Sequence, residues 1–247
     1  LLAAILGDYS ICVVDPAAAP DRRADLLAAL GPDATVDGDG LRRIAAPEAT
    51  GPAITEAGYV ARSSGSTGSG PRGVMAPWSA LAAFAPSGAE ALELDQGSTW
   101  AEVSHPAYDM AMTNLLLALA VGAAIHVSPA LSDQLRPLRF IERVGATHVR
   151  LAPRFADLAA AEQRPSRAMP LQVWGSGGDR LMSAQADLLI ALGIPAVVNT
   201  YGTSETIGFA SAARFSLSEA PPSMRGCMPI GRGRVGRWTT TIVDTEN

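Results

Sequence analysis

A loop of small and hydroxyl-bearing residues is the first stretch of the chain whose composition could support chemistry. Residues 63–73 read SSGSTGSGPRG and follow an alternating stretch at 59–62 that is typical of a strand. Glycines permit backbone conformations in which several N–H groups point into one concavity, and the hydroxyls add further donors. Arg72 contributes a fixed positive charge. The loop is therefore suited to a polyanion, most simply a nucleotide triphosphate.

Two familiar phosphate-binding patterns fit this loop poorly. The Walker pattern G-x-x-x-x-G-K-[ST] begins at Gly65 but meets Pro71 where its lysine belongs. The dinucleotide pattern G-x-G-x-x-G begins at Gly68 and also contains Pro71, while Pro77 interrupts the helix that should follow. A flexible solvent-exposed loop is a further alternative, but a strand leads into this stretch and an ordered-looking segment follows it.

A second motif, NTYGTSE at 199–205, carries three side chains suited to a nucleotide. Tyr201 offers a flat face for a purine, Ser204 a hydroxyl for a phosphate, and Glu205 an oxygen ligand for Mg²⁺. An ordinary strand-to-helix turn, with Ser204 or Thr203 as the helix N-cap, explains the same residues without function.

Two further stretches place acidic residues beside turns. In WGSGGDRL at 174–181 the glycines allow close backbone approach, and Asp179 is a candidate ligand or a cap of the next helix. In HPAYDMAMTN at 105–114, Asp109 opens an apolar helix. It is either a first-turn carboxylate that complements the helix dipole or the binding partner of a cation.

These motifs resemble, in order, those of the adenylate-forming superfamily, and they are closest to the adenylation domains of nonribosomal peptide synthetases. The loop resembles the family's TSGSTGKPKGV, with one extra residue before Pro71 and with Arg72 in place of lysine. NTYGTSE resembles NxYGPTE, with Thr203 and Ser204 in place of proline and threonine. WGSGGDRL resembles GGExL, and the dipeptide at 108–109 resembles the start of F-D-x-S.

The resemblance implies a role for each matching position. The implied catalytic residues are Arg72, Ser204 and Glu205, and Glu205 is also the implied metal ligand. The ATP-binding residues are Ser64, Gly65, Ser66, Thr67, Gly68, Gly177, Gly178, Asp179, Asn199, Thr200, Tyr201 and Gly202. The amino acid contacts Asp109, which pairs with its α-amino group, and Met110, Thr113, Gly175, Thr200, Gly208 and Phe209.

The implied function is ATP- and Mg²⁺-dependent activation of an amino acid carboxylate to an aminoacyl-AMP. The aminoacyl group then passes to the phosphopantetheine thiol of a peptidyl carrier protein in the biosynthesis of a peptide natural product such as an antibiotic. A neighbouring condensation domain and a helper protein are further candidate partners. An acyl- or aryl-CoA ligase core and a catalytically inactive adenylation-like module are the alternatives. Because the family's first strands and its C-terminal subdomain have no counterpart in these residues, we expect this piece alone to be poorly active.

Composition is compatible with this interpretation. Hydrophobic residues make up 48% and charged residues 17% of the 247 residues, enough for a large buried core. A net charge of -5 argues against a nucleic-acid surface. No stretch predicts a membrane span, and two isolated cysteines, Cys12 and Cys227, favour a reducing cytoplasm.

The elements that must position the motifs alternate between helix and strand. This predicts an α/β fold with helices layered on mostly parallel sheets, the catalytic core of the adenylate-forming N-terminal domain. Each motif falls at the carboxyl end of a predicted strand, where ligands bind in such folds. We expect an N-terminal part (1–58), a pocket subdomain with the loop (59–215) and the start of the last core subdomain (216–247). The predicted strands lie at 9–14, 59–62, 100–103, 123–127, 147–151, 171–174, 196–199 and 237–243, and the helices at 20–30, 109–121, 135–144, 154–163 and 181–192.

Overall fold

A computed structural model describes residues 1–37, 40–43, 55–63, 72–128, 130–162, 169–206, 208–216 and 226–231. Two compact units make up the chain, Leu1–Trp78 and Ser79–Asn247. Both strands that flank the loop at 63–73 belong to the first unit. The division at residues 58 and 215 stays a prediction. The predicted strand at 237–243 lies outside the described residues.

The first unit contains two helices and two antiparallel hairpins among its described residues. Helix α2 has the predicted bounds because proline suits its first turn and Gly31 adopts the left-handed conformation (φ 54°) that ends it. The predicted strand at 9–14 is wrong, since the described residues pair there only through an isolated bridge between Ile11 and Tyr59. An apolar run cannot form a strand without a neighbour along its length. The elements are α1 (Leu2–Leu6), α2 (Pro20–Leu30), β1 (Ala34–Asp37), β2 (Gly40–Arg43), β3 (Gly58–Ser63) and β4 (Arg72–Pro77).

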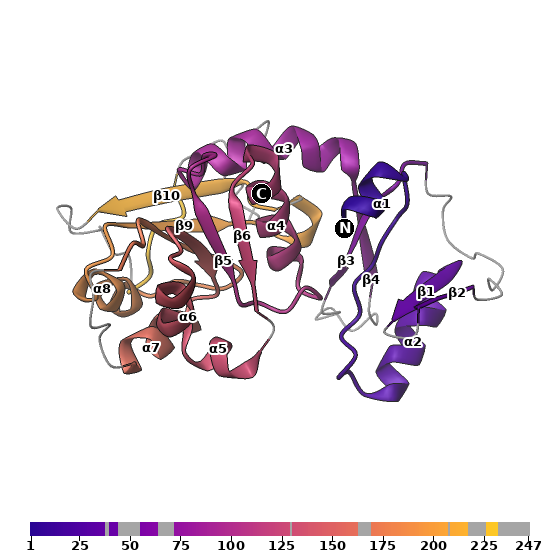
Figure 1. Ribbon diagram of the computed structural model, residues 1–247, viewed down its shortest axis with the longest axis horizontal. Coiled ribbons are helices and arrows are strands. Elements are labelled where there is room, and N and C mark those ends of the chain that lie inside the picture. Colours follow the sequence, from indigo (N-terminus) through magenta and orange to yellow (C-terminus); the bar gives the residue numbers. More distant parts are fainter. Residues whose placement is uncertain are drawn as a thin grey trace, which may run out of the picture. The chain divides into compact units, whose positions relative to one another are not determined.

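The second unit is built on a six-stranded sheet (Figure 1). Its strands are β5 (Thr99–Glu102), β6 (Ala124–Val127), β7 (His148–Leu151), β8 (Val173–Ser176), β9 (Ala196–Tyr201) and β10 (Ser211–Ser216). Their spatial order is β10-β9-β8-β7-β5-β6, and all neighbours run parallel except the antiparallel pair β9 and β10. The helical elements are α3 (Trp78–Ala91), α4 (Asp109–Val121), α5 (Leu131–Leu135), α6 (Pro137–Val144), α7 (Arg154–Ala161), α8 (Ser183–Ala191) and η1 (Ser204–Thr206).

Helices cover both faces of this sheet, because the strands direct apolar side chains alternately to one face and the other. Trp100, Val173 and Val198 belong to an apolar cluster with α3 and α4. Their strand neighbours Trp174 and Val197 belong to a second cluster with α6, α7 and α8. Successive side chains of a strand point to opposite faces, so both faces of these strands are apolar and buried. The predicted α/β class with a mostly parallel sheet is confirmed.

Elements with strong local signals match the prediction best. Helix α4 has the predicted bounds, because its apolar run begins after extended Tyr108 and ends at Gly122, whose φ of 73° is left-handed. Helix α3 was not predicted, and it contains Pro86, a residue that disfavours a helix interior. Strand β10 and helix α5 were also not predicted, since β10 depends on pairing with β9 and α5 is a single short turn. None of the helices in the described part of the chain is long and apolar enough to cross a bilayer.

Candidate functional site

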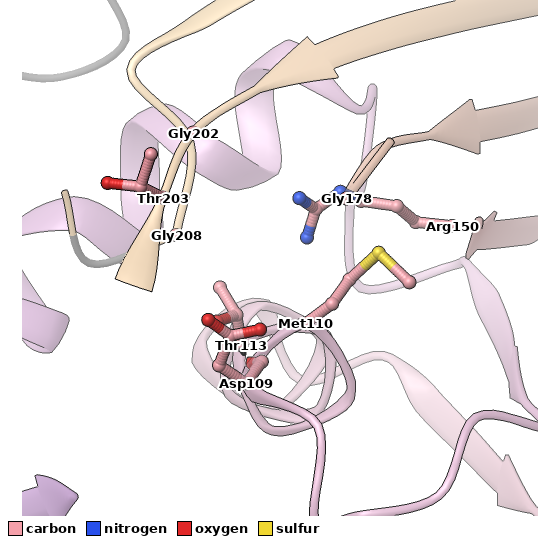
Figure 2. Close-up of a pocket in the computed structure, with 8 residues that line it drawn as sticks. All are labelled: Asp109, Met110, Thr113, Arg150, Gly178, Gly202, Thr203 and Gly208. Atoms are coloured by element: carbon pink, nitrogen blue, oxygen red, sulfur yellow. Dashed lines mark hydrogen bonds between the residues drawn. The ribbon is translucent and has the colours of Figure 1, made fainter. Parts of the chain in front are cut away.

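A small pocket of about 30 Å³ opens beside the carboxyl ends of the parallel strands (Figure 2). The start of α4 forms one wall, the ends of β7 and β8 form the floor, and the connection from β9 to β10 forms the other wall. These segments meet because parallel strands place all their carboxyl ends along one edge of the sheet. The pocket is lined by Asp109, Met110, Thr113, Arg150, Gly178, Gly202, Thr203 and Gly208.

Asp109 and Ser204 connect the two walls. Asp109 is the first residue of α4, a position where the helix dipole favours a carboxylate. Ser204 opens η1, and its hydroxyl donates a hydrogen bond of 2.5 Å to Oδ2 of Asp109. Asp109 lines the pocket, and its hydrogen bond to Ser204 connects the pocket to the turn that follows β9.

Arg150 forms the floor of the pocket and is almost fully buried, with 3% of its surface exposed. Its Nε donates to Oγ1 of Thr200 at 3.0 Å, and its Nη1 donates to Oδ1 of Asn114 at 3.1 Å. The guanidinium lies over the ring of Phe209, with its carbon 4.7 Å from the ring centre. Burial lowers the pKa of Arg150 to about 10, so the side chain stays charged at neutral pH.

Asn114 connects this arginine to a buried acid. Its Nδ2 donates to Oε2 of Glu102 at 2.7 Å and to the backbone oxygen of Arg150 at 3.0 Å. Oε1 of Glu102 accepts the backbone N–H of Ser104 at 2.8 Å. Burial raises the pKa of Glu102 to about 7, although these hydrogen bonds oppose the shift. The floor is thus a polar network embedded between apolar layers.

Two glycines of β8 and the turn after it make room for the arginine. A Cβ on Gly175 would lie 2.9 Å from Cβ of Arg150, and one on Gly177 would lie 3.1 Å from its Nη2 and overlap Oγ1 of Thr200. Real Cβ atoms do not approach neighbours this closely without displacing them. The glycine spacing on β8 and the arginine on β7 therefore form one complementary arrangement.

With this geometry in view, the chain matches the AMP-binding enzyme family over residues 9–244. The chain belongs to that family. It is 32% identical over 148 residues to D-lysergyl-peptide-synthetase subunit 2 of Claviceps purpurea, a match that covers 60% of this chain and 11% of that protein. This chain therefore corresponds to a small part of its curated relative.

Solved structures of the family share the fold. A Vibrio cholerae adenylation domain, AlmE, in complex with glycyl-adenosine-5'-phosphate, is 25% identical with a TM-score of 0.60, over 70% of this chain and 32% of that one. The N-terminal subdomain of Klebsiella oxytoca NpsA, in complex with 3-hydroxyanthranilyl-AMSN, has a TM-score of 0.72 over 93% of this chain and 62% of that one. At 17% identity the second likeness concerns the fold alone.

The structure brings together most of the residues predicted to contact the amino acid. Thr200 and Phe209 lie behind the pocket wall, where both contact Arg150, and Gly175 packs against the stem of the same arginine. The predicted residues that line the pocket itself are Asp109, Met110, Thr113 and Gly208, joined by Gly178 and Gly202 from the ATP-binding set.

The remaining predicted nucleotide residues of this unit lie near the same edge with different surroundings. Tyr201 ends β9 with 49% of its surface exposed, and Glu205 is exposed on η1, where a hydrogen bond with the Thr203 side chain lowers its pKa. Asn199 is buried with its amide donating to the backbone oxygens of Met228 and Pro229. Its alternation with Thr200 places it on the opposite face of the sheet.

One alternative expected Asp179 to cap the following helix, but the structure shows that it does not. Its Oδ1 accepts the N–H of Arg180, while α8 begins at Ser183 after Met182 at the N-cap. The Asp179 side chain is instead exposed beside the pocket glycine Gly178. Its assignment to the nucleotide stays a prediction.

Most of the predicted phosphate-binding loop lies outside the described residues. Ser64, Gly65, Ser66, Thr67 and Gly68 lie outside the described residues. Arg72 begins β4, but its side chain is not among those described. The assignment of these residues to ATP therefore stays a prediction.

Sequence reasoning missed the polar floor of the pocket. Arg150 sits in the apolar strand THVRL, Glu102 in TWAE, and Asn114 in an otherwise apolar helix. Arginine and glutamate are seldom fully buried unless they have partners, so three isolated polar residues in apolar elements were an available signal. Their spacing along the chain gave no indication that they meet.

The raised pKa of Glu102 predicts a pH dependence of local stability. Because its pKa is about 7 in the folded chain and 4.5 for the reference side chain, its stabilising contribution is complete below pH 4.5 and is lost as the pH rises to about 7. The change is about 3 kcal/mol. Amide hydrogen exchange of β5 and α4, corrected for intrinsic rates, measures it in the full-length polypeptide. As the pH rises from 4.5 to about 7, the opening free energy of wild type should fall relative to that of Glu102→Gln. A difference between the two proteins that does not change with pH would contradict the prediction.

Proposed function

We propose that this chain is the nucleotide- and substrate-binding core of a ligase that activates an amino acid as its adenylate. The activated aminoacyl group then passes to a carrier-protein thiol during assembly of a peptide natural product. Membership of the AMP-binding enzyme family and the relation to a peptide synthetase subunit support the reaction class.

The observation that carries the proposal is that Asp109 lines the pocket and is hydrogen-bonded there by Ser204 of the YGTSE segment. A carboxylate in a partly buried pocket requires a cation or a donor to offset its desolvation. The α-ammonium group of an amino acid supplies that cation. Its own carboxylate, two bonds away, then lies beside the YGTSE segment, whose side chains suit a nucleotide.

The described residues fit ATP and a magnesium ion. Tyr201 presents a half-exposed ring at the end of β9 on which an adenine can stack. Glu205 is exposed, and its lowered pKa keeps it ionised as an oxygen ligand for Mg²⁺. Bound Mg²⁺ neutralises phosphate charge. The triphosphate of ATP is bound by the loop at 63–73, whose hydroxyls and glycines can donate hydrogen bonds to it.

In the proposed reaction the residues act by positioning and by electrostatics. Asp109 holds the amine, so that the substrate carboxylate faces the α-phosphate. The amine replaces Ser204 as the partner of Asp109, and the single proton of the Ser204 hydroxyl can then be donated to a phosphate oxygen. A carboxylate oxygen forms a bond to the α-phosphorus and pyrophosphate leaves. A thiol then attacks the acyl carbon and AMP leaves, which transfers the aminoacyl group to the carrier.

The test is amino-acid-dependent exchange of labelled pyrophosphate into ATP by the full-length polypeptide that carries this chain. We expect at least one amino acid to stimulate exchange, and Glu205→Gln to reduce it by about 100-fold, since the variant loses a charged metal ligand. Glu90→Gln, at an exposed position on α3, is the matched control and should retain wild-type exchange.

The acyl- or aryl-CoA ligase alternative makes a different prediction for the same assay. Carboxylic acids that lack an α-amino group would then support exchange as well as amino acids do, and Asp109 would have no role in selecting between them. That outcome would overturn the assignment of Asp109 to the amine. Absence of exchange with every acid tested would instead favour an inactive module.

A further inference from the structure

The guanidinium of Arg150 is the feature of the pocket that the proposed function leaves unexplained. Figure 2 shows the arginine extending from β7, with its nitrogen atoms directed toward the space between the start of α4 and the connection that carries Gly202. Asp109 lies on the α4 side of that space. The pocket therefore offers one negative and one positive group to the same ligand.

One amino group of the guanidinium remains available. Nε donates to Thr200 and Nη1 donates to Asn114, but Nη2 has no hydrogen-bond partner among the residues that the structure describes. Gly177 leaves the approach to this nitrogen open, because a Cβ there would lie 3.1 Å from it. This amino group is a charged donor on a residue that lines the pocket, which makes it a place for an acceptor from a ligand.

The charge of Arg150 is also not offset by direct contact. No carboxylate in the described part of the chain lies within 4.0 Å of its nitrogens. The charges of Asp109 and Glu102 both favour the charged arginine, but Asp109 is hydrogen-bonded by Ser204 and Glu102 reaches the arginine only through the amide of Asn114. A buried cation held by neutral partners gains most from a ligand that carries an anion.

Resting on the proposed function, we propose that Arg150 selects an amino acid whose short side chain carries a carboxylate, as aspartate does. The α-amine pairs with Asp109, the α-carboxylate faces the nucleotide, and the side-chain carboxylate accepts a hydrogen bond from Nη2 of Arg150. A short side chain fits best, because the pocket has a volume of only about 30 Å³ and Met110 borders it.

A purely structural role for Arg150 is the competing explanation. As a counterion of Asp109 and Glu102 and a support for Thr200, the arginine would affect the fold of the pocket without contacting the substrate. Such a role predicts equal losses for all substrates when the residue is changed. A selecting role predicts a change in the ratio of kcat/KM values between substrates, and this ratio is independent of the fraction of folded enzyme.

The experiment measures pyrophosphate exchange by the full-length polypeptide with aspartate, asparagine and alanine. Wild type should prefer aspartate to asparagine by about 100-fold in kcat/KM, the size expected for a charge-assisted hydrogen bond in a buried site. Arg150→Gln should abolish this preference, and Arg150→Lys should retain part of it. Arg139→Gln, an exposed arginine of α6, should leave the ratio unchanged.

Binding gives a readout that does not depend on turnover or on the stability of variants. The wild-type protein should bind the non-hydrolysable aspartyl sulfamoyl-adenosine more tightly than its asparaginyl counterpart by a similar factor. Exchange with neutral amino acids that equals or exceeds exchange with aspartate would overturn the role of Arg150 while leaving the proposed function intact. Failure of every amino acid to support exchange would overturn both.

Discussion

Replacing Asp109 with asparagine should raise KM for the amino acid substrate by about 100-fold, with a smaller change in kcat. The substitution keeps the shape of the side chain and an oxygen that can accept the hydrogen bond from Ser204, but it removes the charge that faces the α-amine. Loss of one partner of a buried, hydrogen-bonded charge pair costs about 3 kcal/mol, which corresponds to this factor. Initial rates of pyrophosphate exchange over a range of amino acid concentrations measure it.

Two comparisons make this prediction specific. The α-hydroxy analogue of the preferred amino acid lacks the cation, so its KM should be nearly the same for Asp109→Asn and wild type. Asp187→Asn changes an exposed aspartate of α8 and should behave as wild type. If Asp109→Asn binds the amino acid as tightly as wild type does, Asp109 is a first-turn carboxylate of α4 with no role in amine recognition.

Replacing Gly202 with alanine should disrupt the pocket wall and reduce the rate of pyrophosphate exchange by more than about 100-fold. A Cβ at Gly202 would overlap the backbone oxygen of Gly208 and lie 2.6 Å from Cα of Phe209. These are backbone atoms, so no side-chain rotation can relieve the clash, and the connection from β9 to β10 must open. Opening it separates Ser204 from Asp109 and costs about 3 kcal/mol, at the upper end for overpacking.

Stability and activity should change together in this variant. Hydrogen exchange of β9 and β10 should accelerate in Gly202→Ala, because Ala210 donates its N–H to Tyr201 across this turn. Gly97→Ala is the matched control, since a Cβ there meets only Oδ1 of Asp95 at 3.4 Å, an ordinary contact. If Gly202→Ala kept wild-type hydrogen-exchange protection of β9 and β10 and wild-type pyrophosphate exchange, the close approach of the Gly202 and Gly208 backbones would not be required.

The fold was predictable where local patterns are strong. The apolar run of α4 is bounded by an extended residue and by left-handed Gly122, so propensity and capping agree on its bounds. The alternation of such helices with strands predicted an α/β fold with helices layered on mostly parallel sheets. The segment at 9–14 has a similar apolar run, yet it forms only a bridge at Ile11, because pairing requires a partner that the run itself does not specify.

The pocket was predictable in part. Motif order and residue type placed Asp109, Ser204 and Gly202 in one candidate site, and the structure finds Asp109 and Ser204 in direct contact. Arg150 was missed, since a charged residue in the middle of an apolar strand has no local signature of the cavity it faces. The role of Arg150 becomes visible only in the tertiary structure, where a Cβ on Gly175 or Gly177 would crowd the arginine side chain.

The sequence by itself determined the α/β class, most helices of the pocket unit and the family, because these follow from periodicity, caps and short motifs that each lie within a few residues. Tertiary structure decided the pairing of β9 with β10, the close approach of Gly202 to Gly208, and the burial of Arg150 between Asn114, Thr200 and Phe209. These features arise from contacts between residues far apart in the chain. Their energies depend on which elements become neighbours, and no local pattern carries that information.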